Sequence, residues 1–137
     1  MIITKIINLS KSNFNKIKKL IKIQLDESYQ INNGYVLIND FNKILGYCLY
    51  TEDNNKHFIK IDWIYSNKGF GSELLSRLER SFFKKYNKII LCCSIGTNEK
   101  KETVLRRINF YIKNNYRVTN FNFRDKYDVS LEMTKNK

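Results

Sequence analysis

The stretch from Ile59 to Leu75 constrains the fold of this chain more than any other. An apolar-rich run passes through a short polar turn that holds Gly69 and Gly71, and a helical pattern begins directly after it. Such a turn gathers free backbone N–H groups at the positive end of a helix dipole, which favours a phosphate-bearing ligand. The alternative is a plain tight connection, because glycine reaches positive φ without a Cβ penalty.

The length and composition predict one globular domain. A chain of 137 residues can bury one sizeable core, so we expect a single domain over residues 1–137. Aliphatic and aromatic residues are too abundant for a disordered chain. No apolar stretch is long enough for a membrane span, and the start Met1–Lys5 is too short and too soon interrupted for a signal peptide. We therefore expect a soluble, cytoplasmic protein that does not associate with membranes.

The cysteines do not predict a disulfide framework or a metal site. The chain has three, Cys48, Cys92 and Cys93, with two of them adjacent and no C-x-x-C spacing. All three lie in apolar, strand-like runs, where a buried free thiol is the expected state.

The formal net charge of +12 has two interpretations. It can attract a polyanion such as nucleic acid, or a polyanionic cofactor. It can also reflect an AT-rich genome, because Lys, Asn and Ile are abundant while the chain contains neither Pro nor Ala. In that case many lysines simply form a solvated surface.

Hydrophobic periodicity predicts seven strands and three helices in the order β-α-β-β-β-α-β-α-β-β. The expected strands are Ile2–Leu9, Tyr35–Ile38, Ile44–Tyr50, Phe58–Tyr65, Lys88–Ile95, Tyr116–Phe123 and Tyr127–Thr134, and the expected helices begin after a Ser10 or Ser12 cap, at Gly71 and near Glu102. This order predicts an α/β fold with a central mixed sheet, flanked by helices on both faces. The section around the glycine turn should form a parallel crossover, and the turn lies where open α/β sheets tend to bind ligands.

Three motifs together resemble the GNAT acetyltransferase superfamily. The turn Ser66–Gly71 is in register with the family pattern [Arg/Gln]-x-x-Gly-x-[Gly/Ala], and Ile59–Trp63 aligns with the strand before it without a gap. The run Phe110–Tyr116 is similar to the aromatic-Tyr-Glu-Lys-x-Gly-Phe segment with which the family's second-last helix ends, and Tyr127–Lys135 resembles its last strand. The resemblance covers essentially the whole chain and implies a GNAT-like fold with a mostly antiparallel seven-stranded sheet.

Three positions depart from the family pattern. Ser66 stands where the loop usually has Arg or Gln, Asn115 replaces the Gly after the helix, and Val104 occupies a position where many members have Asn. Asn115 is compatible with the left-handed conformation that this position needs.

The resemblance implies acetyl-CoA as cosubstrate and no metal. The backbone of the strand would pair with the pantetheine arm, and the turn would hold the pyrophosphate through its N–H groups. The implied cofactor-binding residues are Ile61, Asp62, Trp63, Asn67, Lys68, Gly69, Phe70, Gly71 and Ser72.

The resemblance also suggests the groups that move protons. Tyr111 matches the family tyrosine that protonates the departing thiolate, although a tyrosine on an apolar helical stripe is usually a core residue. Glu52, Asp53 and Asp62 border the expected site and are candidate bases, with a solvated surface charge as the alternative for each. The single histidine, His57, is a further candidate.

The sequence thus predicts an N-acetyltransferase that moves acetyl directly from acetyl-CoA to a primary amine. The acceptor is a protein N-terminus, a lysine or a small amine. Two alternatives are a GNAT-fold binding module without catalysis and a basic nucleic-acid-binding domain. The oligomeric state is left open, a homodimer included.

Overall fold

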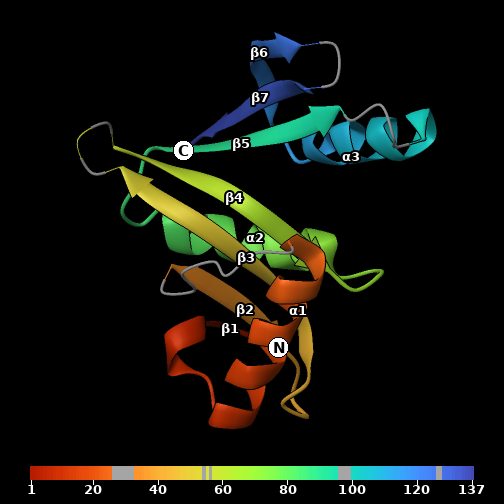
Figure 1. Ribbon diagram of the computed structural model, residues 1–137. Coiled ribbons are helices and arrows are strands. Elements are labelled where there is room, and N and C mark those ends of the chain that lie inside the picture. Colours follow the sequence, from red (N-terminus) through yellow and green to blue (C-terminus); the bar gives the residue numbers. More distant parts are fainter. Residues whose placement is uncertain (26–32, 54, 56, 96–99, 126–127) are drawn as a thin grey trace. The chain divides into compact units, whose positions relative to one another are not determined.

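The computed structural model describes residues 1–25, 33–53, 55, 57–95, 100–125 and 128–137 (Figure 1). The elements are β1 (Ile2–Lys5), η1 (Ile6–Asn8), α1 (Lys11–Leu25), β2 (Gly34–Ile38), β3 (Ile44–Asp53), β4 (Phe58–Ser66), α2 (Gly71–Phe82), β5 (Lys88–Ile95), α3 (Lys101–Lys113), β6 (Arg117–Asp125) and β7 (Asp128–Asn136). The predicted order of strands and α-helices is confirmed.

The first strand is shorter than the sequence predicts. It ends at Lys5, and Ile6–Asn8 forms a 3-10 turn in which the Leu9 N–H donates to the Ile6 carbonyl at 3.1 Å. This turn places Ile6 in the core with no exposed surface and leads the chain into α1. Ser10 caps that helix, because its hydroxyl accepts a hydrogen bond from the Asn13 N–H at 3.3 Å.

The strands form one mixed sheet with the order β1-β2-β3-β4-β5-β7-β6. The pairs β1–β2, β2–β3, β5–β7 and β6–β7 are antiparallel. Strands β4 and β5 are parallel, with a register that runs from Phe58 opposite Lys88 to Ile61 opposite Leu91. The predicted mixed, mostly antiparallel sheet with one central parallel crossover is therefore confirmed.

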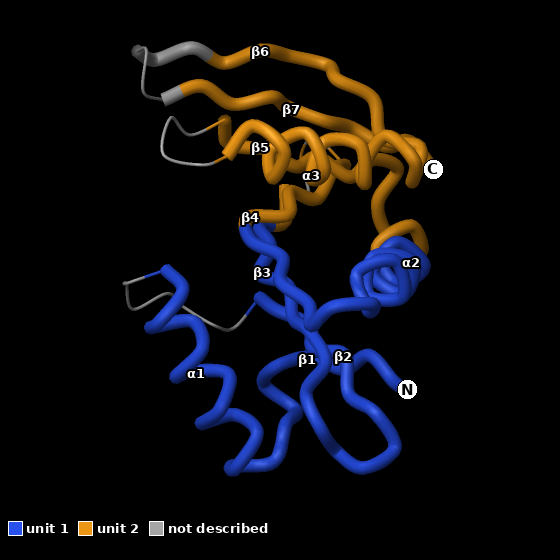
Figure 2. The backbone as a smooth tube through the Cα atoms, turned by 90° about the vertical axis from the view of Figure 1, so that its right-hand side faces the viewer, with its two compact units in different colours: residues 1–51, 63–81 blue, residues 52–62, 82–137 orange. Residues whose placement is uncertain are grey.

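The chain divides into two compact units (Figure 2). Unit 1 comprises residues 1–51 and 63–81, and unit 2 comprises residues 52–62 and 82–137. The expectation of a single domain over residues 1–137 stays a prediction.

In unit 1, α1 and α2 lie on opposite faces of the strands (Figure 2). Strand alternation explains this arrangement, since neighbouring apolar residues point to opposite faces. Buried residues of η1, α1 and the strands pack together on the α1 face: Ile6, Ile17, Ile21, Val36, Ile38, Tyr47 and Leu49. On α2, Leu74, Leu75 and Leu78 have no exposed surface.

In unit 2, the alternation of β5 decides the state of the two adjacent cysteines. Ile89, Leu91 and Cys93 are buried, whereas Cys92 is exposed. The expectation of three buried thiols is thus wrong for Cys92, because successive strand residues face opposite sides. The Cys93 thiol lies 3.7 Å from the Met133 sulfur.

In the part of the chain that the structure describes, no helix is long and apolar enough to cross a membrane.

Candidate functional site

The turn between β4 and α2 holds Gly69 in a left-handed conformation, whereas Gly71 is the first residue of α2. Gly69 has φ of +92°, a left-handed conformation that residues with a side chain rarely adopt. A Cβ at this position would meet no protein atom within 4 Å. The glycine is therefore needed for its backbone conformation rather than for space, and the surface above it is open.

Two hydrogen bonds inside unit 1 hold the turn in place. The Asn67 N–H donates to the Leu45 carbonyl of β3 at 2.8 Å, and the Phe70 N–H donates to the Asn67 carbonyl at 3.1 Å. These two amides are therefore already engaged within the protein. The first intrahelical bond of α2 joins the Leu74 N–H to the Phe70 carbonyl at 3.0 Å.

The first turn of α2 offers backbone donors. Among the described residues, no acceptor is found for the N–H groups of Gly71, Ser72 and Glu73, as expected for the start of a helix. The helix dipole places partial positive charge at the same point. This set of donors fits an anionic group such as a phosphate.

Side-chain charges near the turn are also compatible with an anion. Lys68 is exposed at the turn itself. Glu73, the acidic residue in the first turn of α2, is engaged by the Arg77 guanidinium four residues later, as the sequence predicts. Its charge is therefore compensated locally.

Close approach of β3 to the end of β4 requires a second glycine. A Cβ on Gly46 would lie 2.7 Å from the Tyr65 carbonyl oxygen and 3.0 Å from the Ser66 Cβ. Ser66 itself is half-buried. Gly46 thus lets β3 pack closely against the residues that lead into the turn.

Tyr111 lies in unit 2, near the C-terminal end of α3, and only 6% of its surface is exposed. The helix ends in a Schellman motif: the Tyr116 N–H donates to the Tyr111 carbonyl and the Asn115 N–H to the Ile112 carbonyl, both at 3.0 Å. Asn115 has φ of +70°, which confirms the left-handed conformation expected there. The Tyr111 ring packs edge to face against the rings of Phe110 and Tyr116. Its orientation is therefore fixed from both sides.

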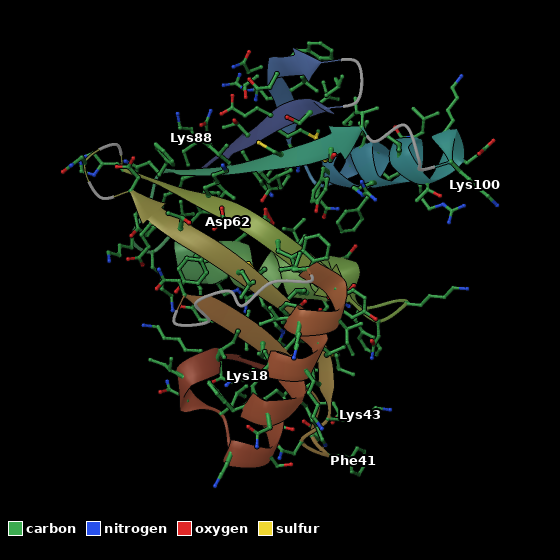
Figure 3. All side chains as sticks on the ribbon, in the orientation of Figure 1. Lys18, Phe41, Lys43, Asp62, Lys88 and Lys100 are labelled. Atoms are coloured by element: carbon green, nitrogen blue, oxygen red, sulfur yellow. The ribbon has the colours of Figure 1, made fainter. Side chains whose placement is uncertain are left out.

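The candidate bases differ in their surroundings. Glu52, at the end of β3, lies 3.9 Å from the Lys85 ammonium in a solvent-exposed ion pair. Asp62 is exposed on β4 (Figure 3), and Asp53 is half-buried at the end of β3. His57 is exposed in the β3–β4 connection, where its carbonyl accepts from the Asn87 N–H at 3.2 Å. Glu52 is thus held by a cation, whereas Asp62 lies on the strand that leads to the turn.

A hydrogen-bonded group on the α1 face of unit 1 was not expected from the sequence. The indole N–H of Trp63 donates to the Tyr47 hydroxyl at 3.0 Å and to Gln24 Oε1 at 3.3 Å, and the Tyr47 hydroxyl also donates to Gln24 Oε1. Burial raises the pKa of Tyr47, so the phenol stays neutral and can donate. No local motif predicts this group, because its members come from α1, β3 and β4.

The free thiols and the metal-binding residue types do not form a second site. Burial raises the pKa of Cys93 to about 11, so it is protonated near neutral pH and unsuited to nucleophilic attack. Among the described residues, no cluster of His, Cys, Asp and Glu could hold a metal ion.

Comparison with curated proteins finds one relevant relative. The chain is 32% identical over 114 residues to a protein of Acanthamoeba polyphaga mimivirus that is named an uncharacterized N-acetyltransferase. The match covers 75% of this chain and 27% of that protein, so the chain spans about a quarter of the length of its relative. No family model matches the chain.

Several solved structures with a similar fold are acetyltransferases. An aminoglycoside 6'-N-acetyltransferase complexed with coenzyme A superposes with a TM-score of 0.75 at 12% identity, covering 99% of this chain and 97% of that one. A spermidine N-acetyltransferase chimera from Vibrio cholerae and hSSAT gives 0.72 at 14% identity, over 93% and 91% of the two chains. Ard1 from Thermoplasma volcanium gives 0.64 at 14% identity, over 98% and 96%. At these identities the likeness shows a shared fold.

Proposed function

Because the chain belongs to the GNAT superfamily, we propose that it is an acetyl-CoA-dependent N-acetyltransferase that moves acetyl directly to a primary amine. The observation that carries the proposal is the β4–α2 turn, with Gly69 at φ of +92° and backbone donors at the start of α2. Similar structures include one complexed with coenzyme A, which supports the same ligand here.

We assign the pyrophosphate of acetyl-CoA to the β4–α2 turn. The N–H groups of Gly71 and Ser72 would donate to its oxygens, and Lys68 would add positive charge. Asn67 and Phe70 would contribute by shaping the turn through the bonds that their own amides make. Ser66 has a shorter side chain than the Arg or Gln that is usual at this position in the family, but the backbone donors do not depend on it.

The pantetheine arm would pair with the backbone of β4 in the manner of an added strand. The β4–β5 register includes Ile61 opposite Leu91. We therefore place the arm beyond this pair, at Asp62 and Trp63, with Ile61 at the start of the contact. Acetyl-CoA would bring an activated acetyl group, as a thioester, to this part of the strand.

Acetyl transfer needs a neutral amine and a proton for the departing thiolate. We propose that the Tyr111 hydroxyl donates that proton, since the rings around it hold it in one orientation. Asp62 is the preferred base for the ammonium, because it is exposed on β4, the strand that leads to the turn. The amine nitrogen would then bond to the acetyl carbon as the carbon–sulfur bond breaks, without a covalent enzyme intermediate.

A GNAT-fold binding module without catalysis is the second candidate. Ser66 and Val104, which replace residues common in the family, favour it. It differs from the enzyme in one measurable way: it binds acetyl-CoA but turns over no amine.

The test is a thermal-shift titration with acetyl-CoA, followed by a thiol-release assay on a panel of primary amines. At a hundredfold excess over Kd, ligand binding should stabilise the fold by about 2.7 kcal/mol, which raises Tm by roughly 5–10 °C for a domain of this size. The absence of any shift at millimolar acetyl-CoA would exclude both the enzyme and the binding module.

Tyr111→Phe separates a catalytic tyrosine from a core tyrosine. Loss of the proton donor should lower kcat by about 10²-fold, while the ring packing, Tm and the acetyl-CoA shift stay close to those of the wild type. Equal kcat in both proteins would mean that Tyr111 serves the core alone. A lowered Tm that accounts for the lost activity would point to the same conclusion.

A further inference from the structure

A basic cavity of about 480 Å³ opens on the α1 side of unit 1. Its walls come from the middle of α1, the β2–β3 turn, the start of β3 and the end of β4. Three of the lining residues are lysines, Lys16, Lys19 and Lys43, and none is acidic.

The positive charge of the cavity is uncompensated within the part of the chain that the structure describes. The ion pairs found there join Met1 to Asp40, Arg77 to Glu73 and Lys85 to Glu52, and the cavity lysines take part in none of them. Asp40, in the same turn as Lys43, is engaged by the N-terminal ammonium at 3.1 Å. The cavity therefore offers three cations to a ligand.

The same cavity also offers apolar contacts. Leu20 and Ile44 line it, and Phe41 at the tip of the β2–β3 turn is 90% exposed. Figure 3 shows Phe41 and Lys43 projecting from this turn. A ligand that suits the cavity carries negative charge together with an apolar or aromatic group.

Hydrogen bonds hold the two walls together. The amide group of Asn13, a residue only 3% exposed, donates to the carbonyl and to the side-chain oxygen of Asn42, both at 3.2 Å. Within the turn, Asn39 Oδ1 accepts from the N–H groups of Phe41 and Lys43, both at 2.9 Å. The cavity is thus built by buried and local bonds rather than by chance proximity of long side chains.

The cavity borders the β4–α2 turn of unit 1. Tyr65, near the end of β4, and Asn67, in the turn, line it. The Tyr65 ring lies 6.0 Å from that of Tyr47, which is hydrogen-bonded to Trp63. Tyr65 and Trp63 share one face of β4, because they are two residues apart.

We propose that this cavity binds a carboxylate-bearing segment of the acceptor, so that the amine is presented by an acidic peptide. The inference rests on the proposed acetyltransferase function and names its substrate class. Cationic acceptors such as polyamines would be repelled by the three lysines.

The strand geometry sets where the acidic residues should lie. Two residues of an extended strand span about 7 Å. Tyr65 lines the cavity and lies two residues after Trp63, where we place the end of the pantetheine arm. The cavity therefore begins roughly two residues of extended peptide from Trp63. Acidic residues two to four positions from the acetylated amine should therefore have the largest effect.

The binding test uses fluorescence anisotropy with peptides of one length that carry two acidic, neutral or basic residues at these positions. The acidic peptide should bind about tenfold more tightly than the neutral one, and Lys16→Gln/Lys19→Gln/Lys43→Gln should remove this preference. Lys5→Gln/Lys11→Gln/Lys18→Gln is the matched control. It loses the same charge, and none of its three positions lines the cavity.

Three results with peptides would overturn the proposal: equal binding of the acidic and neutral peptides, equal losses in both triple variants, or stronger binding of the basic peptide. A fourth would be a loss of RNA binding, and not of peptide binding, that is confined to the cavity variant. Anisotropy needs no turnover, so it tests the cavity even if the protein is not an enzyme. Conversely, acetyl-CoA stabilisation and turnover of a small neutral amine test the proposed function without the cavity. In the turnover assay, the cavity variant should raise KM for the acidic peptide about tenfold and leave kcat unchanged.

Discussion

Two glycines, Gly46 and Gly69, shape the end of β4 and the turn after it, each for a different physical reason. Gly69 supplies a positive φ in open space, whereas Gly46 leaves room for the Tyr65 carbonyl. Alanine at position 69 would be strained but free of clashes. At position 46 it would overlap with backbone atoms that cannot easily move.

These reasons predict different costs for the two substitutions. Gly69→Ala should lower the free energy of unfolding by about 1–2 kcal/mol, the cost of a left-handed residue with a side chain. Gly46→Ala should cost about 2–4 kcal/mol, as overpacking against backbone does. Urea denaturation of both variants measures the difference, and a larger loss for Gly69→Ala would contradict this interpretation.

At the scale of elements, the end of α3 positions the proposed catalytic tyrosine. Its Schellman motif needs a left-handed residue at Asn115, and the carbonyl of Tyr111 is one of the acceptors. Any residue that resists this conformation should therefore disturb both the helix end and Tyr111.

A pair of substitutions tests this helix end. Asn115→Val should destabilise the protein by about 1–2 kcal/mol, because a β-branched residue is strained at positive φ. Asn115→Gly should keep or slightly raise stability, since glycine has no such strain. Chemical denaturation gives both values. If the two variants were equally stable, the left-handed conformation would not be the reason for Asn at this position.

The group formed by Gln24, Tyr47 and Trp63 connects α1 to two strands of unit 1. Tyr47→Phe should cost about 1 kcal/mol, the typical loss when a buried hydrogen bond is removed. Trp63 is the single tryptophan of the chain, so its fluorescence reports both the unfolding curve and the local change. Tyr65→Phe is the control and should change stability by less than about 0.5 kcal/mol.

At the scale of the whole molecule, buried phenol and thiol groups in both units should make the free energy of unfolding fall at alkaline pH. Burial raises the pKa of Cys93 to about 11 from 9.0, and it also raises the pKa values of Tyr47 and Tyr86. A raised pKa in the folded state means that the unfolded chain ionises first. The contribution of Cys93 is therefore complete below pH 9 and is lost as pH rises toward 11.

The unfolding free energy should accordingly fall by on the order of 1–2 kcal/mol between pH 8.5 and pH 10.5 through Cys93 alone. Urea denaturation at several pH values measures the slope. Cys93→Ala should flatten this part of the profile, whereas Cys92→Ala should not, because Cys92 is exposed. An unchanged slope in Cys93→Ala would contradict the assignment.

The sequence by itself determined the order of strands and helices, the mixed sheet and the glycine turn. These features depend on local periodicity and on the conformational freedom of single residues such as Gly69 and Asn115, which can be read without knowing any neighbour in space. The same applies to the Glu73–Arg77 pair, whose spacing along one helix brings the two side chains together.

Only the tertiary structure decided which distant residues meet. Lys16 and Lys19 look like part of a solvated helix face until α1 and the β2–β3 turn place them in one cavity with Lys43. Gln24, Tyr47 and Trp63 come from three elements, and the engagement of the Asn67 amide depends on how the turn closes on β3. The physical reason is that burial, charge and hydrogen bonding depend on distances through space, which one-dimensional periodicity does not contain.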